Sequence, residues 1–474
     1  MLEVCLLMLT MVVRVLWLRA VPPQPLAAVD ARGYDLLAHN LLDGVGLSLR
    51  RLPPFCPTTL RTPGYPLFLA LAYRFAGGVR GAIFLQVLLE VLTTALIVRL
   101  GAEMGDRRVG RLAALLYALN GTTWRYTGDL YAEILLLPLM ALGLWQMVRW
   151  FESPRTASAA VMGTAWGAAL LVKPNLLYLL LFWLAATALW AMRRDRLRVW
   201  WPAPIAAGLL LAPWLLRNGL RTGTWTVSTA FRVNLARVSA VATMAEVRHV
   251  PAEPWTPTWE AFYDALVRMT AQREGWAIPA VEVGDCAQRR RREAAVAASA
   301  RQVVLRHPEA ALRAHLRGVV RSLLDPGHRF WYAVLWHRPW AETGVVPDIW
   351  ARIGWSFERG AVGDALLAFW RERMVRLPPE AAWLWWGLWL GRMALWWWGL
   401  RALRRLPRRV RIVLAGTVLY FLLLPGPIAY ERFYLPAIPA VVVLVAAGMV
   451  RTAPAPPSPG RECARRPRPC PSPK

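Results

Sequence analysis

Residues 79–99 read VRGAIFLQVLLEVLTTALIVR, and this apolar run decides the class of fold. A helix needs about 20 mostly apolar residues to cross a bilayer, and this run has that length. Two polar side chains, Gln86 and Glu90, interrupt it. A charge at such depth has to face protein or water and find a partner, so an arginine is the natural partner for Glu90. The sequence does not identify which arginine this is.

Nine more apolar runs are distributed along the 474-residue chain. They lie near residues 4–18, 109–120, 130–148, 157–172, 174–192, 199–216, 381–400, 410–426 and 436–450. The composition agrees with a membrane location, because 57% of the residues are hydrophobic, only 18% are charged and the mean hydropathy is +0.34. We therefore expect an all-α polytopic membrane protein with about ten transmembrane helices, in a range of roughly 9 to 12.

The net charge of +28 suggests a nucleic-acid partner, but the positions of the arginines argue against one. The arginines cluster at 99–111, 193–198, 401–411 and beyond 451, in alternate loops between the apolar runs. This is the pattern of cytoplasmic loops under the positive-inside rule, so we expect no nucleic-acid binding. The remaining loops then face the periplasm or the cell exterior, and these are 20–78, 121–129, 173–175, 217–380 and 427–435.

The same pattern divides the chain into four parts. Residues 1–216 form an N-terminal membrane domain with seven spans, which includes the first outer loop at 20–78. Residues 217–380 form a mostly helical extracytoplasmic region, and 381–450 form the C-terminal spans. The Pro- and Arg-rich tail at 451–474 is expected to be disordered and cytoplasmic. The first run lacks a basic start and contains Arg14, which favours an uncleaved span over a signal peptide.

The outer segments contain helical periodicity of their own. Residues 34–42 place apolar side chains at helical spacing, and a second apolar helix follows at 67–75; both are too short to span and suit the membrane interface. Residues 307–327 begin at Pro308, end at Pro326–Gly327, and carry one apolar stripe that we expect to pack on the membrane domain. The stripe consists of Leu312, Leu316, Val319, Val320, Leu323 and Leu324. The five cysteines have no CxxC spacing and no disulfide framework, so we assign them no role.

Asp30 opens the helical pattern of the first outer loop and has two interpretations. As an N-cap, its carboxylate would bond the backbone amides near Gly33. As a general base beside Tyr34 on an apolar face, it would be partly desolvated, which raises the pKa of a carboxyl group. The residues alone leave these alternatives open. Asp35, His39 and Asp43 follow at i, i+4 and i+8, where a solvated face is more probable than a metal site.

Basic side chains also occur at outer loop edges, where the positive-inside rule disfavours them. Acids and cations gathered there predict a site for a phosphate-bearing ligand, since arginine binds phosphate through a bidentate fork and lysine as a point charge. The residues concerned are Arg125, Asp129 and Glu133; Lys173 and Asn175; Arg217, Asn218 and Arg221; and Glu431 and Arg432.

Several stretches, in this order, resemble the GT-C superfamily of integral membrane glycosyltransferases, in particular bacterial protein-mannosyltransferase-like and aminoarabinose-transferase-like enzymes. They are VDARGYDLLAHNLLDGVGLS, RTPGYPLFLALAYRFAGG, YTGDLYAEILL, LLVKPNLL, APWLLRNGLRTGTWTVSTAFRVNLA and YERFYLPAIPAVVVL. The resemblance places the catalytic acids on Asp30 and Glu133. It places binding of the donor phosphate on Lys173, Arg217 and Arg432. It gives supporting positions to Tyr34, Asn40, Tyr65, Asp129, Asn175, Asn218 and Glu431.

The resemblance implies transfer of a sugar from a polyprenyl-phosphate carrier to an acceptor hydroxyl on the outer face of the cytoplasmic membrane, with inversion and with Asp30 as base. It requires no cofactor, and it allows a divalent metal without indicating one; the partners would be the lipid-linked donor, membrane lipids, and a glycan, lipid or protein acceptor. The alternative is a transporter or flippase of lipid-linked sugars. Glu90 and Arg392, both charged residues within apolar runs, are the features that favour this alternative.

Overall fold

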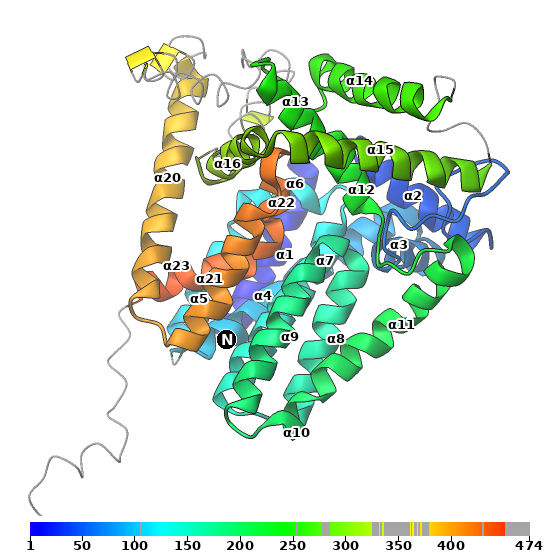
Figure 1. Cartoon of the computed structure of the whole chain (residues 1–474). Coiled ribbons are helices and arrows are strands. Elements are labelled where there is room, and N and C mark those ends of the chain that lie inside the picture. The colour runs from blue at the N-terminus through cyan, green and yellow to red at the C-terminus, as the bar shows by residue number, and fades with distance from the viewer. Residues whose placement is uncertain are drawn as a thin grey trace, which may run out of the picture.

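The computed structural model describes residues 1–324 apart from 105, 253 and 277–284, residues 379–450 apart from 429–430, and single positions or short pieces between 325 and 378. The described chain is a bundle of long helices with a layer of crossing helices over one end (Figure 1). No strand is assigned in this described part, which confirms the all-α class. The predicted disordered tail at 451–474 lies outside the described residues.

All ten apolar runs coincide with helices of the bundle. These helices are α1 (Leu2–Ala20), α4 (Gly78–Ala102), α5 (Arg107–Ala118), α7 (Ala132–Glu152), α8 (Thr156–Val172), η1 with α9 (Pro174–Leu176 and Leu177–Met192), α10 with α11 (Leu197–Trp200 and Pro202–Thr222), α20 (Pro379–Leu403), α21 (Arg408–Leu423), and η6 with α23 (Leu435–Ala437 and Ile438–Met449). Shorter elements lead into the last of them, namely η5 (Gly426–Ile428) and α22 (Glu431–Tyr434).

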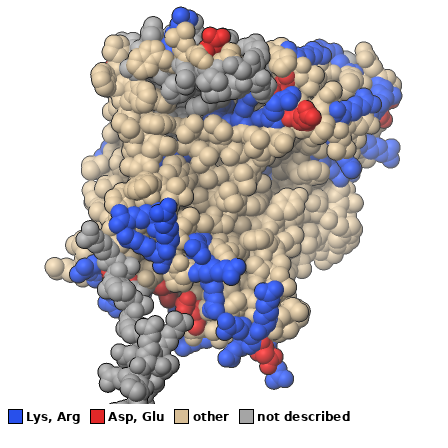
Figure 2. Space-filling model, turned by 60° about the vertical axis from the view of Figure 1, so that its left-hand side comes forward, with Lys and Arg blue, Asp and Glu red and all other residues tan. Residues whose placement is uncertain are grey.

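Five helical segments in the described residues are long and apolar enough to cross a membrane, namely Gly78–Ala102, Ala132–Glu152, Pro174–Met192, Leu197–Thr222 and Arg432–Met449. Helix α8 is a shorter apolar helix. The surface agrees with this reading, because Figure 2 shows Lys and Arg near the lower end and in the upper helical layer, with a largely uncharged band between them. The chain is thus a multi-pass membrane protein, while the full number of ten spans stays a prediction.

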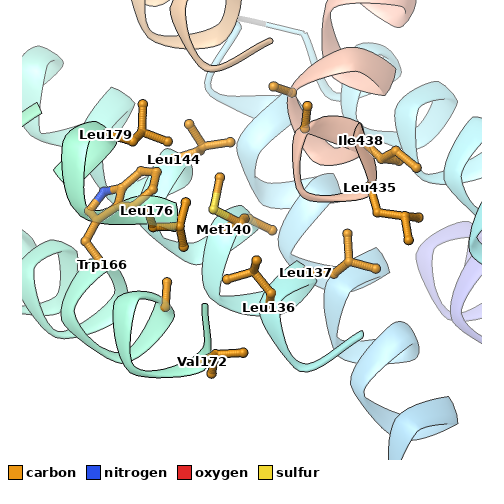
Figure 3. Packing of buried hydrophobic residues seen from close by; sticks show 14 of the residues in the cluster. Leu136, Leu137, Met140, Leu144, Trp166, Val172, Leu176, Leu179, Leu435 and Ile438 are labelled. Carbon is orange, nitrogen blue, oxygen red and sulfur yellow. The ribbon is translucent and has the colours of Figure 1, made fainter. Parts of the chain in front are cut away.

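Helix α7 lies at the centre of the bundle. In Figure 3 its side chains Leu137, Met140 and Leu144 lie between Trp166 of α8 and Ile438 of α23. Lipid provides no hydrophobic drive between helices, so close packing has to hold such a bundle together. Helix α8 packs closely on α11, because a Cβ built on Gly163 would lie only 2.0 Å from the carbonyl oxygen of Ala203. Any larger side chain at Gly163 would push these two helices apart.

The outer layer consists of the two predicted helices of the first outer loop, α2 (Val29–Leu42) and α3 (Gly64–Phe75), together with the helices after residue 229. The latter are α12 (Ala230–Asn234), η2 (Leu235–Ala240), α13 (Val241–Val247), α14 (Pro257–Glu274), α15 (Cys286–Arg306) and α16 (Pro308–Leu324). The short helix α6 (Gly121–Thr127) precedes α7. The described residues between 230 and 324 are thus mostly helical, while the division of the chain into membrane and extracytoplasmic parts stays a prediction.

Helix α16 begins at the predicted Pro308, and its predicted packing face is confirmed only in part, since Leu323 of the stripe packs against the buried cluster of the membrane helices. Leu312, Leu316 and Val320 of the apolar stripe are 58%, 49% and 42% exposed. The buried face instead contains Gly318, where a built Cβ would lie 1.7 Å from the carbonyl oxygen of Gly426. The small residues of this face allow a closer backbone approach than the leucine stripe permits, and this approach determines the orientation of the helix.

Candidate active site

Asp30 lies in the first turn of α2, where it binds two arginines instead of capping the helix. The N-cap residue is Ala28 and no side chain caps this helix, so the cap interpretation of Asp30 is wrong. One carboxylate oxygen of Asp30 accepts a hydrogen bond from Arg61, and the other accepts one from Arg432. Charged guanidinium donors bind a carboxylate more strongly than neutral backbone amides do.

Glu133 is the second acid of the site and lies in the first turn of α7, with 1% of its surface exposed. Its Oε1 accepts hydrogen bonds from Lys173 Nζ at 2.5 Å and from Arg432 Nε at 2.7 Å. Arg432 therefore joins two carboxylates from distant parts of the chain. We call the connected side chains Arg61, Asp30, Arg432, Glu133 and Lys173 the ion network.

Local backbone features bring these side chains together. Lys173 follows the last residue of α8 in an extended conformation, as expected for the residue before Pro174. Gly64, at the start of α3, approaches the end of α8 so closely that a built Cβ would lie 2.7 Å from the carbonyl oxygen of Leu171. This contact holds the first outer loop, and with it Arg61, beside the end of α8. Arg432 lies on the single turn of α22.

Aromatic rings line the ion network. The Arg432 guanidinium lies 4.6 Å from the ring centroid of Tyr131, and that of Arg61 lies 5.1 Å from the ring of Tyr34. Tyr34 meets Tyr65 edge-on at 4.9 Å, and the Tyr65 hydroxyl donates to Gln86 Oε1 at 2.6 Å. Cation–π contacts of this kind stabilise cations that are partly removed from water. The predicted supporting residues Tyr34 and Tyr65 therefore form part of the wall, together with Gln86.

Asp30 has an ionised carboxylate, contrary to the expected rise in its pKa. Burial alone would raise the pKa of Asp30, but the Arg61 and Arg432 guanidiniums outweigh burial and hold that pKa well below its ordinary value. The periodicity indicated the apolar surroundings correctly and could not indicate the two cations. The complete network has three cations and two carboxylates, which leaves one positive charge in excess.

Asp129 contributes its backbone, and its carboxyl group is not part of the ion network. Its carbonyl oxygen accepts a hydrogen bond from Gln86 Nε2 at 3.0 Å. Burial raises the pKa of the Asp129 carboxyl to about 6, although Arg125 opposes this rise. It is therefore a half-desolvated acid that titrates close to neutral pH.

Within the described residues, the Arg217 side chain binds the first outer loop and not the acids of the ion network. Its guanidinium donates to the carbonyl oxygens of Thr58 at 2.7 Å and Leu47 at 3.3 Å, and to Asn218 Oδ1 at 3.0 Å. The Asn218 amide donates onward to the carbonyl oxygen of Thr226 at 2.8 Å. The structure thus gives Arg217 and Asn218 loop-holding contacts, and their predicted role toward the donor remains a prediction.

The other supporting residues have mixed placements. Asn40 donates to the carbonyl oxygens of Ser48 at 2.6 Å and Arg50 at 3.0 Å, which closes the turn after α2. Asn175 is the middle residue of η1, and its carbonyl oxygen accepts a hydrogen bond from Tyr420. The Glu431 side chain lies outside the described atoms, although its backbone begins α22.

The predicted solvated face of α2 is only partly solvated. The Asp35 carboxylate accepts a hydrogen bond from the Tyr73 hydroxyl at 2.8 Å, and its side chain is 15% exposed. His39 and Asp43 on the same face are exposed, as expected. Within the described residues, no group of three or more His, Cys, Asp and Glu side chains is arranged to hold a metal ion.

Sequence reasoning missed Arg61, the second guanidinium on Asp30. The available signal was that Arg61 is the first residue of the RTPGYP stretch, an arginine in a predicted outer loop against the positive-inside rule. Tyr131, whose ring lies under Arg432, was missed as well. Its position two residues before Glu133 in the outer loop was the only sequence signal.

The charged residues inside the apolar runs have structural partners. Glu90 is fully buried and pairs with Arg14 of α1, which also donates to the carbonyl oxygen of Ala118 at 2.7 Å and to Thr123 at 2.7 Å. The expectation of an arginine beside Glu90 is thus confirmed, and the partner is the arginine that interrupts the first run. Arg392 donates to the carbonyl oxygen of Ser322. Both residues therefore serve as contacts between helices.

One disulfide contradicts the expectation that the cysteines have no role. Cys56 of the first outer loop is bonded to Cys286 at the start of α15, with Cα atoms 5.4 Å apart. The two residues are 230 positions apart, so no local spacing could reveal the pair. The bond ties the loop that carries Arg61 to the outer helical layer.

Comparison with known proteins gave a match to a family and a likeness to a solved structure. Residues 60–216 match the family model of dolichyl-phosphate-mannose-protein mannosyltransferase. The structure is similar to that of the Archaeoglobus fulgidus oligosaccharyltransferase in complex with Zn and sulfate, at 13% identity and a TM-score of 0.38, over 94% of this chain. The chain spans about half, 48%, of that protein, and the likeness is too low to carry an argument. No curated protein matched the chain.

The matched segment contains Arg61 at the end of the first outer loop, α3, the helix α7 that carries Glu133, and Lys173 after α8. The match, the helical membrane fold and the quoted motifs agree with one another. Residues 60–216 thus resemble the mannosyltransferase family, which supports a membrane glycosyltransferase of the GT-C superfamily.

Proposed function

We propose that this protein transfers a sugar from a polyprenyl-phosphate donor to an acceptor hydroxyl at the outer face of the cytoplasmic membrane. The observation that carries the proposal is the ion network, in which three cations surround two carboxylates. A sugar on a polyprenyl phosphate is a phosphodiester with one negative charge, and that charge balances the single excess positive charge of the network. The aromatic wall of Tyr34 and Tyr131 leaves an apolar surface beside the cations.

The charge balance is maintained during the proposed reaction. The acceptor oxygen attacks the anomeric carbon of the donor sugar, the bond from that carbon to the phosphate oxygen breaks, and the electron pair stays on the phosphate. The acceptor proton moves to Asp30. The phosphate gains about one negative charge as it becomes a monoester, and Asp30 loses one, so the total charge of the site is unchanged. As Asp30 becomes neutral, Arg61 and Arg432 are released to stabilise the leaving phosphate.

A strongly ionised Asp30 is compatible with this role if the proton moves late. Transfer to an alcohol passes through a cationic, oxocarbenium-like sugar, and the attacking hydroxyl becomes acidic only as its new bond forms. A carboxylate of low pKa then accepts the proton, although it could not remove one from a free alcohol. A phosphate is already a good leaving group, so no protein acid is required. A single displacement of this kind inverts the anomeric centre.

Buried polar atoms without partners lie close in sequence to the cations. Within the described residues, Thr62 Oγ1, Asn175 Oδ1 and the Tyr434 hydroxyl have no hydrogen-bond partner. They lie one residue after Arg61, two after Lys173 and two after Arg432, respectively. Buried polar atoms are almost always paired, so Thr62 and Asn175 are candidates to bind hydroxyl groups of the sugar, whereas the Tyr434 ring lies against Trp396 of α20.

The disulfide supports an outward location for the site. Disulfides persist in oxidising compartments and are rare in the cytosol. The bond between Cys56 and Cys286 joins the first outer loop to the outer helical layer, both of which the arginine distribution places outside. The disulfide and the arginine distribution are independent arguments, and both support the outer side of the membrane for the site.

The test is a transfer assay in membranes that contain the wild type, Asp30→Asn or Asp43→Asn. Asp43 is an exposed acid at the end of the same helix and serves as the matched control. We expect Asp30→Asn to lower release of polyprenyl phosphate by about 100-fold or more, and Asp43→Asn to leave it unchanged. Comparative mass spectrometry of envelope glycans, with and without the protein, identifies the sugar and acceptor for this assay.

Two results would reject the proposal. The first is an Asp30→Asn protein that still releases polyprenyl phosphate and glycosylates the acceptor at the wild-type rate. The second is movement of a lipid-linked sugar across proteoliposome membranes without cleavage of the sugar–phosphate bond, which would identify a flippase instead.

A further inference from the structure

The outer helical layer contains a cavity. It is bounded by α13, α14 and α15, and its volume is about 450 Å³. Ligand sites in proteins usually enclose about 300 to 1,000 Å³, so the cavity is large enough for one or two sugar rings. None of the residues that line it belongs to the ion network.

Four basic side chains contribute to the lining of this cavity. Arg248, Arg273, Arg306 and His307 line it, and no acidic side chain does. Arg273 is already engaged, because its guanidinium donates to Glu274 and to Gln302 at 2.9 to 3.0 Å. Arg306 makes no side-chain hydrogen bond or ion pair with another described residue. Its guanidinium is therefore available to a ligand, and arginine is the side chain best suited to carboxylate and phosphate groups.

The lining also contains apolar side chains and one unsatisfied hydroxyl. Met244, Val247, Met269 and Val303 supply the apolar surface. Ser299 also lines the cavity, is 1% exposed, and its Oγ has no partner within the described chain. Buried hydroxyl groups are normally hydrogen-bonded, so an unpaired one in a cavity wall points to a ligand that completes it. Gln302 provides a further polar group beside it.

We propose that this cavity binds an anionic sugar unit, that is, a sugar ring that carries a carboxylate or a phosphate. Arg306 binds the anionic group, Ser299 and Gln302 face the hydroxyl groups, and the methionines and valines cover the apolar C–H surface of the ring. A neutral apolar ligand would leave the cations without an anion, and a free inorganic anion would leave the apolar side chains uncovered. The proposal concerns binding alone, so it does not depend on the transfer reaction proposed above.

The test is isothermal titration of the purified full-length protein with glucuronate, glucose 6-phosphate, glucose and inorganic phosphate. We expect glucuronate and glucose 6-phosphate to bind about tenfold or more tightly than glucose and inorganic phosphate. Arg306→Gln should remove about tenfold of the affinity for the anionic sugars, and Ser299→Ala should weaken them by a smaller factor. Arg301→Gln is the matched control, since Arg301 is exposed on the same helix and does not line the cavity.

The outcomes separate a built site from a generally basic surface. An equal loss of affinity in Arg306→Gln and Arg301→Gln would overturn the proposal, because binding would then depend on general positive charge and not on Arg306 in the cavity. Equal affinities for glucose 6-phosphate and inorganic phosphate would overturn it as well, because the apolar side chains would contribute nothing. A thermal melting curve for each variant confirms that it is folded, which is expected since Arg306 is exposed. Liposomes that carry an anionic glycolipid, used as a competitor, distinguish a lipid-borne sugar from a free one.

Discussion

Arg432 is the residue whose replacement best tests the ion network, because it alone contacts both carboxylates. Its guanidinium binds Asp30 and Glu133, while Arg61 and Lys173 each bind one acid. Arg432→Gln leaves each carboxylate with one cation and lowers the net charge of the network from +1 to 0. The site would then keep its buried ion pairs but lose the excess charge that the donor phosphate is proposed to balance.

Arg432→Gln should lower both the stability of the protein and the rate of transfer. A hydrogen bond to a charged group contributes about 1.5–3 kcal/mol, so loss of the bonds to Asp30 and Glu133 costs about 3–6 kcal/mol before the site relaxes. Removal of one preorganised group that stabilises developing negative charge lowers turnover by about 100- to 1,000-fold. Arg432→Lys keeps the charge but cannot reach both acids as a fork does, so we expect an intermediate loss.

The assay measures release of polyprenyl phosphate per amount of folded protein, with a thermal melting temperature for each variant. Arg51→Gln is the control, because Arg51 is an exposed arginine of the first outer loop outside the network. If Arg432→Gln lowers the melting temperature but keeps transfer within about threefold of wild type, Arg432 is a structural residue and the charge-balance argument fails.

Three further changes address other parts of the molecule. Cys56→Ser removes the bond to Cys286 and should destabilise the protein by about 2–4 kcal/mol, which reductant should reproduce in thermal unfolding of the wild type and not in the variant. Arg14→Met leaves Glu90 as an unpaired buried charge and should cost about 3–5 kcal/mol, whereas Arg14→Met with Glu90→Met should recover most of this loss in the same measurement. Asp129 has a pKa raised to about 6, so the folded state binds a proton that the unfolded chain releases, and wild-type stability should fall by about 3 kcal/mol as the pH rises from about 4 to 7. Asp129→Asn should abolish this part of the slope, and an unchanged slope would refute the assignment.

The positions of the helices could be predicted from the sequence because the bilayer imposes a length on apolar runs. Which face of a helix packs could not be predicted in the same way. The apolar stripe of α16 at Leu312, Leu316 and Val320 is exposed, since Gly318 brings its backbone against Gly426 on the opposite face. A hydrophobic stripe describes one helix alone, whereas close approach depends on the partner helix, which the periodicity of a single segment does not contain.

The candidates Asp30, Glu133, Lys173 and Arg432 could be named from the predicted topology and the quoted stretches, whereas Arg61 could not. Their pairing could not be predicted, since Asp30 and Arg432 are 402 residues apart and Glu133 and Arg432 are 299 apart. The direction of the pKa shift of Asp30 depends on this pairing. Burial was predicted and by itself raises the pKa of Asp30. The two guanidiniums outweigh burial, so the net shift of this pKa is downward. The disulfide between Cys56 and Cys286 escaped prediction for the same reason of distance.

If the site lies outside as we propose, the pairing also explains how three cations persist at positions that the positive-inside rule disfavours. Asp30 and Glu133 neutralise two of the three positive charges before any substrate arrives, so the desolvation cost of the site is reduced. A simple anion meets a net charge of only +1 and has to compete with two carboxylates for the same donors. A donor that also contributes a lipid chain and a sugar gains binding energy elsewhere and can displace those carboxylates. Selectivity for a lipid-linked phosphate over free phosphate would therefore follow from the acids of the network as much as from its cations.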